Sequence, residues 1–163
     1  DYANDFLSKL CQKWEEEAKK ATTKVAIFRF GVVLGHGGGA FTKMLKPFRL
    51  GFGGHIASGN QAFSFIHIED LLRAYSFVIE HNLSSTFNLT CPKPTTNLGL
   101  TRVLSKAVRK PALLLLHEFV LKFMYGEGAV ILSEGQDIIP QRLLNLGFKF
   151  KYNDIEETIE NLV

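Results

Sequence analysis

The sequence predicts an α/β protein with parallel strands, followed by a mostly helical C-terminal segment. Short apolar segments alternate with amphipathic segments over the first 110 residues, and the connections between them are short. Alternation of this kind produces parallel strand pairing with helices covering the sheet. The character changes after Pro111, where apolar residues become nearly continuous. We therefore divide the chain into residues 1–110 and 111–163.

Residues 5–20 have the spacing of an amphipathic helix, since apolar side chains recur every three or four positions. This apolar face consists of Phe6, Leu7, Leu10, Cys11, Trp14 and Ala18. Residues 24–34 are rich in Val, Ile and Phe without polar alternation, which predicts a strand buried on both faces. A glycine run over 35–39 ends this strand, and a short helix follows that Pro47 closes.

The middle of the chain continues the alternation. Residues 49–61 are glycine-rich and are expected to form a loop or an irregular strand. The same reasoning then predicts, in order, a short apolar strand over 62–67, a helix over 68–81, a strand over 86–90, and a helix capped by Thr95 or Thr96 that runs to about residue 108.

The C-terminal segment is predicted to be mainly helical. Residues 112–139 form a helical region that begins nearly all apolar, and its leucines and phenylalanines are expected to pack in the core or in a lid. Pro140 begins a further helix that Gly147 ends. The alternation over 148–152 indicates a short edge strand, and Asp154 caps a last helix.

Charge and composition argue against several classes of function. The net charge is +3, and the 19 basic residues are interleaved with acidic ones, whereas nucleic-acid binders show a basic stripe. No apolar run approaches the roughly 20 residues that span a bilayer. Cys11 and Cys91 have no metal-ligand spacing, and we interpret them as buried thiols of an intracellular, reducing compartment, either cytoplasm or an organellar matrix. The first residues look like the approach to a helix, so we expect a longer protein.

The glycines after the strand over 24–34 formally match a dinucleotide-binding fingerprint. Gly35, Gly37 and Ala40 satisfy G-x-G-x-x-A between a strand and a helix. The full fingerprint also needs a second strand and an acidic residue about 20 positions on, and neither follows at the right place. We therefore interpret the run as a loop beyond the carboxyl end of a strand, which is where open α/β sheets bind ligands.

The histidines show no metal-site spacing, so no metal is expected. His67 and Asp70, with His55 nearby, could form a ligand cluster, but we interpret them as a core imidazole and a helix-start carboxylate. Arg29 lies in an apolar strand and needs a partner there. Either a buried ion pair or a bound anion would serve.

Two long segments carry a resemblance to a known family. FRFGVVLGHGGGAFTKMLKPFRLGFGGHIASGNQAFSFIHIEDLLRA resembles the middle of atypical, extended short-chain dehydrogenases of the YfcH-like epimerase family. EGQDIIPQRLLNLGFKFKYNDIEETIENL is similar to the small C-terminal module of the same family. The motifs GVVLG-x-GGGA, PFR-x-G-x-GG and IHI-x-D together make the match specific, and it covers nearly the whole chain.

The resemblance implies the C-terminal part of a Rossmann-type fold. Residues 1–110 would be the C-terminal part of the NAD(P)-binding domain with inserted substrate-binding loops, and residues 111–163 a small helical module. NADP, with NAD as the other option, would bind beside a strand segment made of Phe30, Gly31, Val32 and Val33. An unidentified small-molecule substrate would bind at Gly38, Phe41, Met44, Arg49, Gln61 and His67.

The implied reaction is that of an NADP-dependent epimerase or oxidoreductase, but two family features are missing. The phosphate-binding G-x-x-G-x-x-G belongs to the family's N-terminal half and does not occur here. In relatives with a Tyr-x-x-x-Lys pair, Lys9 would match the Lys, but Asp5 stands in place of the Tyr. The tyrosines Tyr2, Tyr75, Tyr125 and Tyr152 are followed four residues later by Phe6, Ile79, Ala129 and Glu156. No catalytic residue is therefore assigned, and the chain alone is expected to be inactive.

Two alternatives remain open from the sequence. The chain could be a non-enzymatic structural or regulatory protein that keeps the fold, which the missing Tyr and phosphate loop favour. It could also be a standalone module that binds another small ligand through its glycine-rich loops. Half a sheet leaves an unpaired strand edge, so we expect pairing with an N-terminal Rossmann half or with a second copy.

Overall fold

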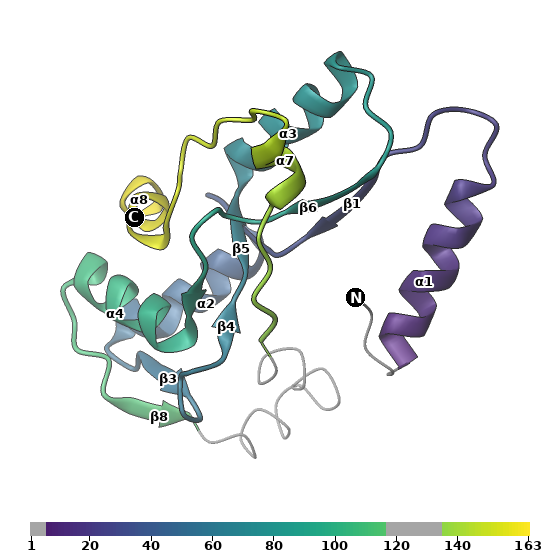
Figure 1. Ribbon diagram of the computed structural model, residues 1–163. Helices are drawn as coiled ribbons and strands as arrows, with labels where there is room; N and C mark the ends of the chain where they lie inside the picture. The colour runs from purple at the N-terminus through teal and green to yellow at the C-terminus, as the bar shows by residue number, and fades with distance from the viewer. Residues whose placement is uncertain (1–5, 117–134) are drawn as a thin grey trace.

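The computed structural model describes residues 6–116 and 135–163 and has mixed α/β architecture (Figure 1). In chain order the elements are α1 (Phe6–Lys19), β1 (Ile27–Phe30), β2 (Val32–Leu34), α2 (Gly39–Leu50), β3 (Gly54–Ile56), β4 (Ala62–Phe63), β5 (Phe65–His67), α3 (Ile68–Glu80), β6 (Thr86–Leu89), β7 (Thr95–Thr96), α4 (Asn97–Val108), β8 (Leu114–Leu116), α7 (Gln141–Asn145) and α8 (Ile155–Leu162).

The central strands pair in parallel, as the alternation predicted. β1 pairs with β6, and β2 pairs with β5. Gly31 joins β1 to β2, and the backbone changes partner there: its N–H donates to the Leu89 carbonyl, whereas the Val32 N–H donates to the Ser64 carbonyl. The predicted strand over 24–34 is therefore one run of backbone in two ladders. A Cβ on Gly31 would lie 2.5 Å from the Ser64 carbonyl oxygen, so this crossing requires glycine.

The prediction that residues 24–34 are buried on both faces is wrong for β1. Its residues are half-buried, and Phe30 is 57% exposed. Phe28 packs against Tyr75, with ring centroids 4.3 Å apart, while Arg29 turns to an acidic partner. The strand that is buried throughout is instead β5, because helices pack on both sides of it.

Two apolar clusters form the core on either side of β5, whose neighbouring residues Phe65 and Ile66 point in opposite directions. The first joins α2, α4 and α8 to the ends of β2 and β5, and includes Leu34, Phe41, Leu45, Phe48, Phe65, Cys91, Leu100, Leu104, Ile155, Ile159 and Leu162. The second joins α3 and α7 to β5 and β6, and includes Ile66, Leu71, Ala74, Val78, Phe87, Leu89, Leu143, Phe148 and Phe150.

The predicted helices with clear capping residues are confirmed. The Thr96 hydroxyl accepts from the Gly99 N–H at the start of α4, and the Asp154 carboxylate accepts from the Glu157 N–H at the start of α8. Pro140 stands at the start of α7, and Gly147 follows its end with φ 81°. α3 covers the predicted range over 68–81 within one residue.

The prediction that Pro47 closes the helix after the glycine run is wrong. α2 continues through Pro47 to Leu50, and Gly51 ends it in the left-handed conformation with φ 85°. A proline inside a helix removes one hydrogen bond and costs about 3 kcal/mol. Pro47 lies on the exposed face, where water can satisfy the freed carbonyl, while Phe48 on the inner face extends the core contact.

The prediction of a helical region over 112–139 is wrong for the part of that range that the structure describes, residues 112–116 and 135–139. Residues 114–116 form β8, which pairs in parallel with β3, and Leu113 is 86% exposed rather than packed in a core. Residues 135–140 have no helix, because their backbone binds side chains: Ser64 Oγ donates to the Gln136 carbonyl at 2.5 Å. Residues 117–134, with Phe119, Leu121 and Phe123, lie outside the described residues.

The predicted edge strand over 148–152 is also wrong, although its alternating burial is right. Phe148, Phe150 and Tyr152 are buried and the two lysines between them are exposed. Their backbone does not join a sheet, because the amides of Lys151 and Tyr152 donate to the side chain of Asp70. The Asp70 carboxylate thus accepts the hydrogen bonds that the backbone of a neighbouring strand would otherwise accept.

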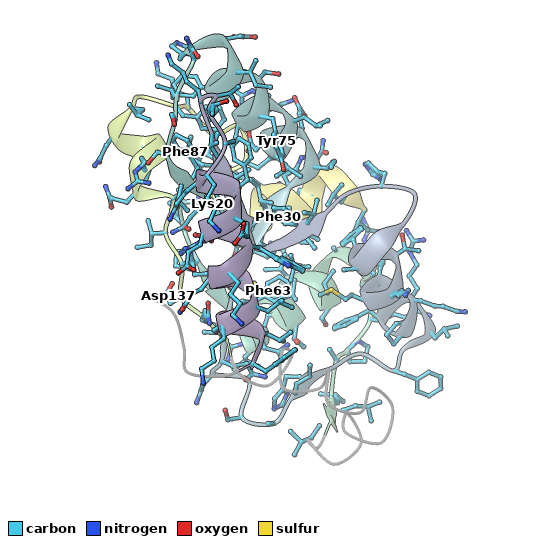
Figure 2. The ribbon with its side chains drawn as sticks, turned by 90° about the vertical axis from the view of Figure 1, so that its right-hand side faces the viewer. Lys20, Phe30, Phe63, Tyr75, Phe87 and Asp137 are labelled. Atoms are coloured by element: carbon cyan, nitrogen blue, oxygen red, sulfur yellow. The ribbon has the colours of Figure 1, made fainter. Side chains whose placement is uncertain are left out.

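Figure 1 shows α1 to one side of the body formed by the other elements, and in Figure 2, seen from that side, α1 lies in front of them. Glu15 accepts two hydrogen bonds from the Arg29 guanidinium, at 2.6 and 2.7 Å, so Arg29 has the ion-pair partner that its position required. Phe6 is 77% and Trp14 65% exposed. The prediction that Cys11 is buried is therefore wrong, because the described residues leave this face of α1 uncovered.

Candidate functional site

The candidate site lies where β2 and β5 end side by side. Leu34 and His67 are register partners at the carboxyl ends of these parallel strands. The glycine-rich loop leaves the sheet after Leu34, and α3 begins directly after His67. A Cβ on Gly35 would lie 2.9 Å from the Ile68 side chain, so the base of the loop packs closely on the first turn of α3. Carboxyl edges of this kind are where α/β sheets bind ligands.

His67 is a buried, fully paired imidazole at this edge. Its Nδ1 accepts from the Glu69 N–H at 3.1 Å and so caps α3, and its Nε2 lies 3.1 Å from Asn161 Oδ1. These bonds require a neutral ring with the proton on Nε2. Burial lowers the pKa of His67 below 6.5, against the opposing effects of the Asn161 hydrogen bond and of Asp70 and Glu69.

Acidic side chains in the first turn of α3 bind the segment after α7 through hydrogen bonds and an ion pair. Asp70, 1% exposed, accepts from the backbone amides of Lys151 and Tyr152, each at 2.9 Å, and pairs with Arg73 at 2.6 Å. Glu69 accepts from Lys151 Nζ at 2.8 Å and from the Tyr152 hydroxyl at 3.1 Å. The hydrogen bond between Glu69 and Lys151 lowers the pKa of the Glu69 carboxyl and raises the pKa of the Lys151 ammonium group.

The glycine-rich loop itself is open. A Cβ added at Gly37, Gly38 or Gly39 would meet no atom within 4 Å. Gly37 and Gly39 have φ 79° and 65°, a conformation that favours glycine. At the near end of the loop, His36 Nε2 lies 3.1 Å from the Asn161 carbonyl oxygen.

The structure places the sequence-predicted cofactor residues along β1 and β2. Phe30 ends β1 with its ring largely exposed, and Gly31 makes the crossing between the two ladders. Val32 and Val33 follow in β2 and are half-buried. The four residues form a continuous stretch that leads to the carboxyl edge. Their contact with a cofactor stays a prediction.

The predicted substrate residues are spread more widely. Gly38 is exposed next to the start of α2, and His67 ends β5 at the same edge. Phe41 is 3% exposed in the first core cluster, which Met44 also packs against. The other two lie elsewhere: Arg49 is near the far end of α2, and Gln61 bonds the Ile56 carbonyl in the loop before β4.

Sequence reasoning missed the residues that complete this edge from the far end of the chain. The Tyr152 ring packs against the His67 ring, with centroids 3.8 Å apart and planes tilted by 30°, and Asn161 binds both His36 and His67. These partners lie more than eighty residues apart in sequence. No local pattern marks them, since Asn161 lies in α8, whose apolar residues have ordinary amphipathic spacing.

Residues 6–116 and 135–163 contain no group of three His, Cys, Asp or Glu side chains that could hold a metal ion. In the same ranges no helix is both long enough and apolar enough to cross a membrane. A surface cavity of about 570 Å³ lies between α4 and α8, but charged side chains such as Arg102 and Glu160 line it, and no predicted site residue does.

Comparison with known proteins identifies the chain's relatives. Residues 118–162 match the family model described as "Domain of unknown function (DUF1731)". The chain is 38% identical to the epimerase family protein SDR39U1 of mouse over 98% of this chain and 56% of that protein. It is 36% identical to the chloroplastic homolog of Arabidopsis thaliana, covering 98% of this chain and 47% of that one. The chain thus spans about half the length of the curated relatives it matches.

Solved structures agree with the sequence matches. The human epimerase family protein SDR39U1, solved with NADPH, superposes with a TM-score of 0.91 at 36% identity, over 97% of this chain and 55% of that one. A nucleoside-diphosphate sugar epimerase from Corynebacterium glutamicum superposes with a TM-score of 0.74 at 28% identity, over 96% and 30%. The chain is therefore similar, over nearly its whole length, to proteins of this epimerase family.

Proposed function

We propose that this chain forms the nicotinamide and substrate side of an NADP-dependent epimerase or oxidoreductase. The observation that carries the proposal is the shared edge of β2 and β5, where an open glycine-rich loop and the start of α3 leave the sheet together. The similarity to a human protein solved with NADPH supports NADP as the cofactor, with NAD as the other option.

The residues present fit one end of such a cofactor. Phe30 offers an exposed aromatic ring at the end of β1, suited to a flat nicotinamide, and the loop over 35–39 leaves open space beyond the strands. The cofactor would supply hydride exchange. The chain's own residues would orient the ring and exclude water from it. The negatively charged phosphates would need loop amides of a G-x-x-G-x-x-G motif, which this chain lacks.

The groups that bind the cofactor phosphates would come from outside this chain. We propose that residues 1–110 complete a Rossmann domain together with an N-terminal half, and that residues 111–163 form the module that closes the substrate side. The exposed side chains Phe6, Leu7 and Trp14 of α1 would contact that half or a second copy. Burial of such a patch stabilises an interface by roughly 25 cal/mol per Å² of apolar surface.

A non-enzymatic role is the alternative, since no tyrosine has a lysine four residues later. Under that alternative the protein keeps the fold and carries out no turnover. Nucleotide binding without epimerisation, oxidation or reduction of any candidate nucleoside-diphosphate sugar would favour it.

The proposal is tested by a matched pair of variants, F30D and F52D, in a protein that includes the preceding half found in the relatives. Both rings are exposed, 57% and 64%, so neither change disturbs the core. F30D places a negative charge beside the predicted nicotinamide position. It is expected to weaken NADPH binding at least about tenfold, which is roughly 1.4 kcal/mol, in a calorimetric titration.

F52D is the control and should leave NADPH affinity unchanged, because Phe52 lies between α2 and β3, away from the predicted cofactor residues. Equal affinities for the two variants would remove the assignment of Phe30. Binding of neither NADPH nor NADH to the unaltered protein would remove the cofactor assignment itself.

A further inference from the structure

The C-terminal residues 148–163 are fastened to the candidate edge by a carboxylate. Asp70 accepts from the amides of Lys151 and Tyr152, and Arg73 of the same helix donates to the Lys149 carbonyl at 2.9 Å. The Tyr152 ring also packs against the His67 ring. The start of α3 and this segment therefore form one polar junction, with the Asp70 side chain almost fully buried inside it.

α8 continues from this junction into the same core cluster as both ends of the glycine-rich loop. Ile155 and Ile159 of α8 pack in one cluster with Leu34, which precedes the loop, and Phe41, which follows it. Each of these four side chains is at most 3% exposed. The position of α8 relative to the ends of the loop is thus set by close packing.

The loop between those ends has little packing of its own, as the open space around Gly37 and Gly38 shows. Asn161 supplies a tether at the end of α8. Its backbone carbonyl oxygen lies 3.1 Å from His36 Nε2, and its side-chain Oδ1 lies 3.1 Å from His67 Nε2. One residue thereby bridges the loop to the end of β5.

We propose that residues 148–163 act as a clamp that positions the glycine-rich loop, with His36 and the Asn161 carbonyl as the contact that holds it. This gives a physical role to the C-terminal part of the segment matched by the domain of unknown function. The loop's use in substrate binding rests on the proposed function. The clamp itself does not, since all its contacts lie within this chain.

The two bonds of Asn161 can be separated by substitution. N161A removes the side-chain bond to His67 but keeps the carbonyl that His36 contacts. H36A removes the loop contact and leaves the His67 bond intact. His36 is exposed, so its loss does not empty a core position. H81A is a matched control, because His81 is also exposed and also bonds a backbone carbonyl, that of Phe77, at the other end of α3.

The experiment measures backbone ¹⁵N order parameters of Gly37 and Gly38 in the 163-residue chain without cofactor. Rigid backbone has values near 0.85 and flexible backbone falls below about 0.6. H36A is expected to lower both glycine values from the rigid toward the flexible range. H36Q should restore them, since the Gln amide can donate to the same carbonyl. N161A and H81A should leave them unchanged.

Unchanged order parameters in H36A would overturn the clamp, as would an equal fall in H81A. A fall in N161A to the H36A level would also overturn it, because the contact would then not run through the backbone carbonyl. NADPH takes no part in the measurement. A failure of the cofactor assignment therefore leaves the result on the clamp intact, and the two ideas fail separately.

Discussion

The two cysteines occupy opposite environments. Cys91 is 3% exposed in the first core cluster, and burial raises the pKa of its thiol to about 12, while Cys11 is exposed on α1. Because the thiolate is the reactive form, Cys91 should be inert at neutral pH. We expect Ellman's reagent to titrate one thiol per folded chain and two in guanidinium chloride. Two fast thiols in the folded chain would contradict the burial of Cys91.

His67 should make stability depend on pH near neutrality. Its folded pKa is lowered below 6.5, so between the two pKa values the unfolded chain binds more protons than the folded one. The stabilising contribution is therefore fully present above about pH 6.5 and is lost as the pH falls through the folded value. Urea unfolding at pH 7.5 and 5.5 should show a larger loss for the wild type than for H67N.

The comparison with H67N removes the contribution of other groups, because Glu69 and the remaining carboxylates titrate in both proteins. Asn also keeps an N-cap acceptor at the start of α3. Identical pH dependence in the two proteins would show that His67 does not titrate as a buried neutral ring.

Asp70 should be the most sensitive polar residue of the junction. In D70N an amide group replaces one of the oxygens that accept from the Lys151 and Tyr152 N–H groups, so one buried donor loses its partner. The expected loss is about 2 kcal/mol in the free energy of unfolding. D137N, at an exposed aspartate, should change it by less than about 0.5 kcal/mol. Similar losses in both would refute the structural role of Asp70.

Some of these residues could be anticipated from sequence and others could not. An arginine in an apolar strand must find a partner, so a partner for Arg29 was expected, but the sequence left an ion pair and a bound anion as alternatives. The interpretation of His67 as a core imidazole and of Asp70 as a helix-start carboxylate also agrees with the structure. Their partners Tyr152 and Asn161 could not be named, because tertiary packing alone brings them there.

At the scale of elements, Gly31 marks the most constrained point of the strands. A Cβ there would lie 2.5 Å from the backbone of Ser64, which cannot move without separating β2 from β5. G31A should cost about 1–3 kcal/mol in urea unfolding. G38A is the matched control: its φ of 172° suits any residue and no atom lies within 4 Å, so it should stay within about 1 kcal/mol of wild type.

Elements defined by local rules were predictable, and those decided by tertiary contacts were not. Caps at Thr96 and Asp154 and the apolar spacing of α3 are local, and those helices were predicted closely. Pro47 did not end its helix, because Phe48 gains core burial beyond it. The alternation over 148–152 was real, but a carboxylate took the place of a neighbouring strand.

At the scale of the whole molecule, the chain is well packed at one side and open at the other. α8 and α4 close the first core cluster, whereas α1 and Phe30 present apolar surface. The family similarity extends over about half of each relative's length. Together these features are consistent with a chain that completes its cofactor site with another half, which is the central claim of the proposed function.

The measurement that tests this claim most directly is a calorimetric titration of the 163-residue chain with NADPH, and with NADH for comparison, beside the same titration of a protein that includes the preceding half. We predict no binding by the chain alone and binding by the longer protein, because under the proposed function the phosphate-binding amides would lie in the added half. Micromolar binding by the chain alone, about −8 kcal/mol, would contradict the account and make the glycine-rich loop over 35–39 the phosphate site.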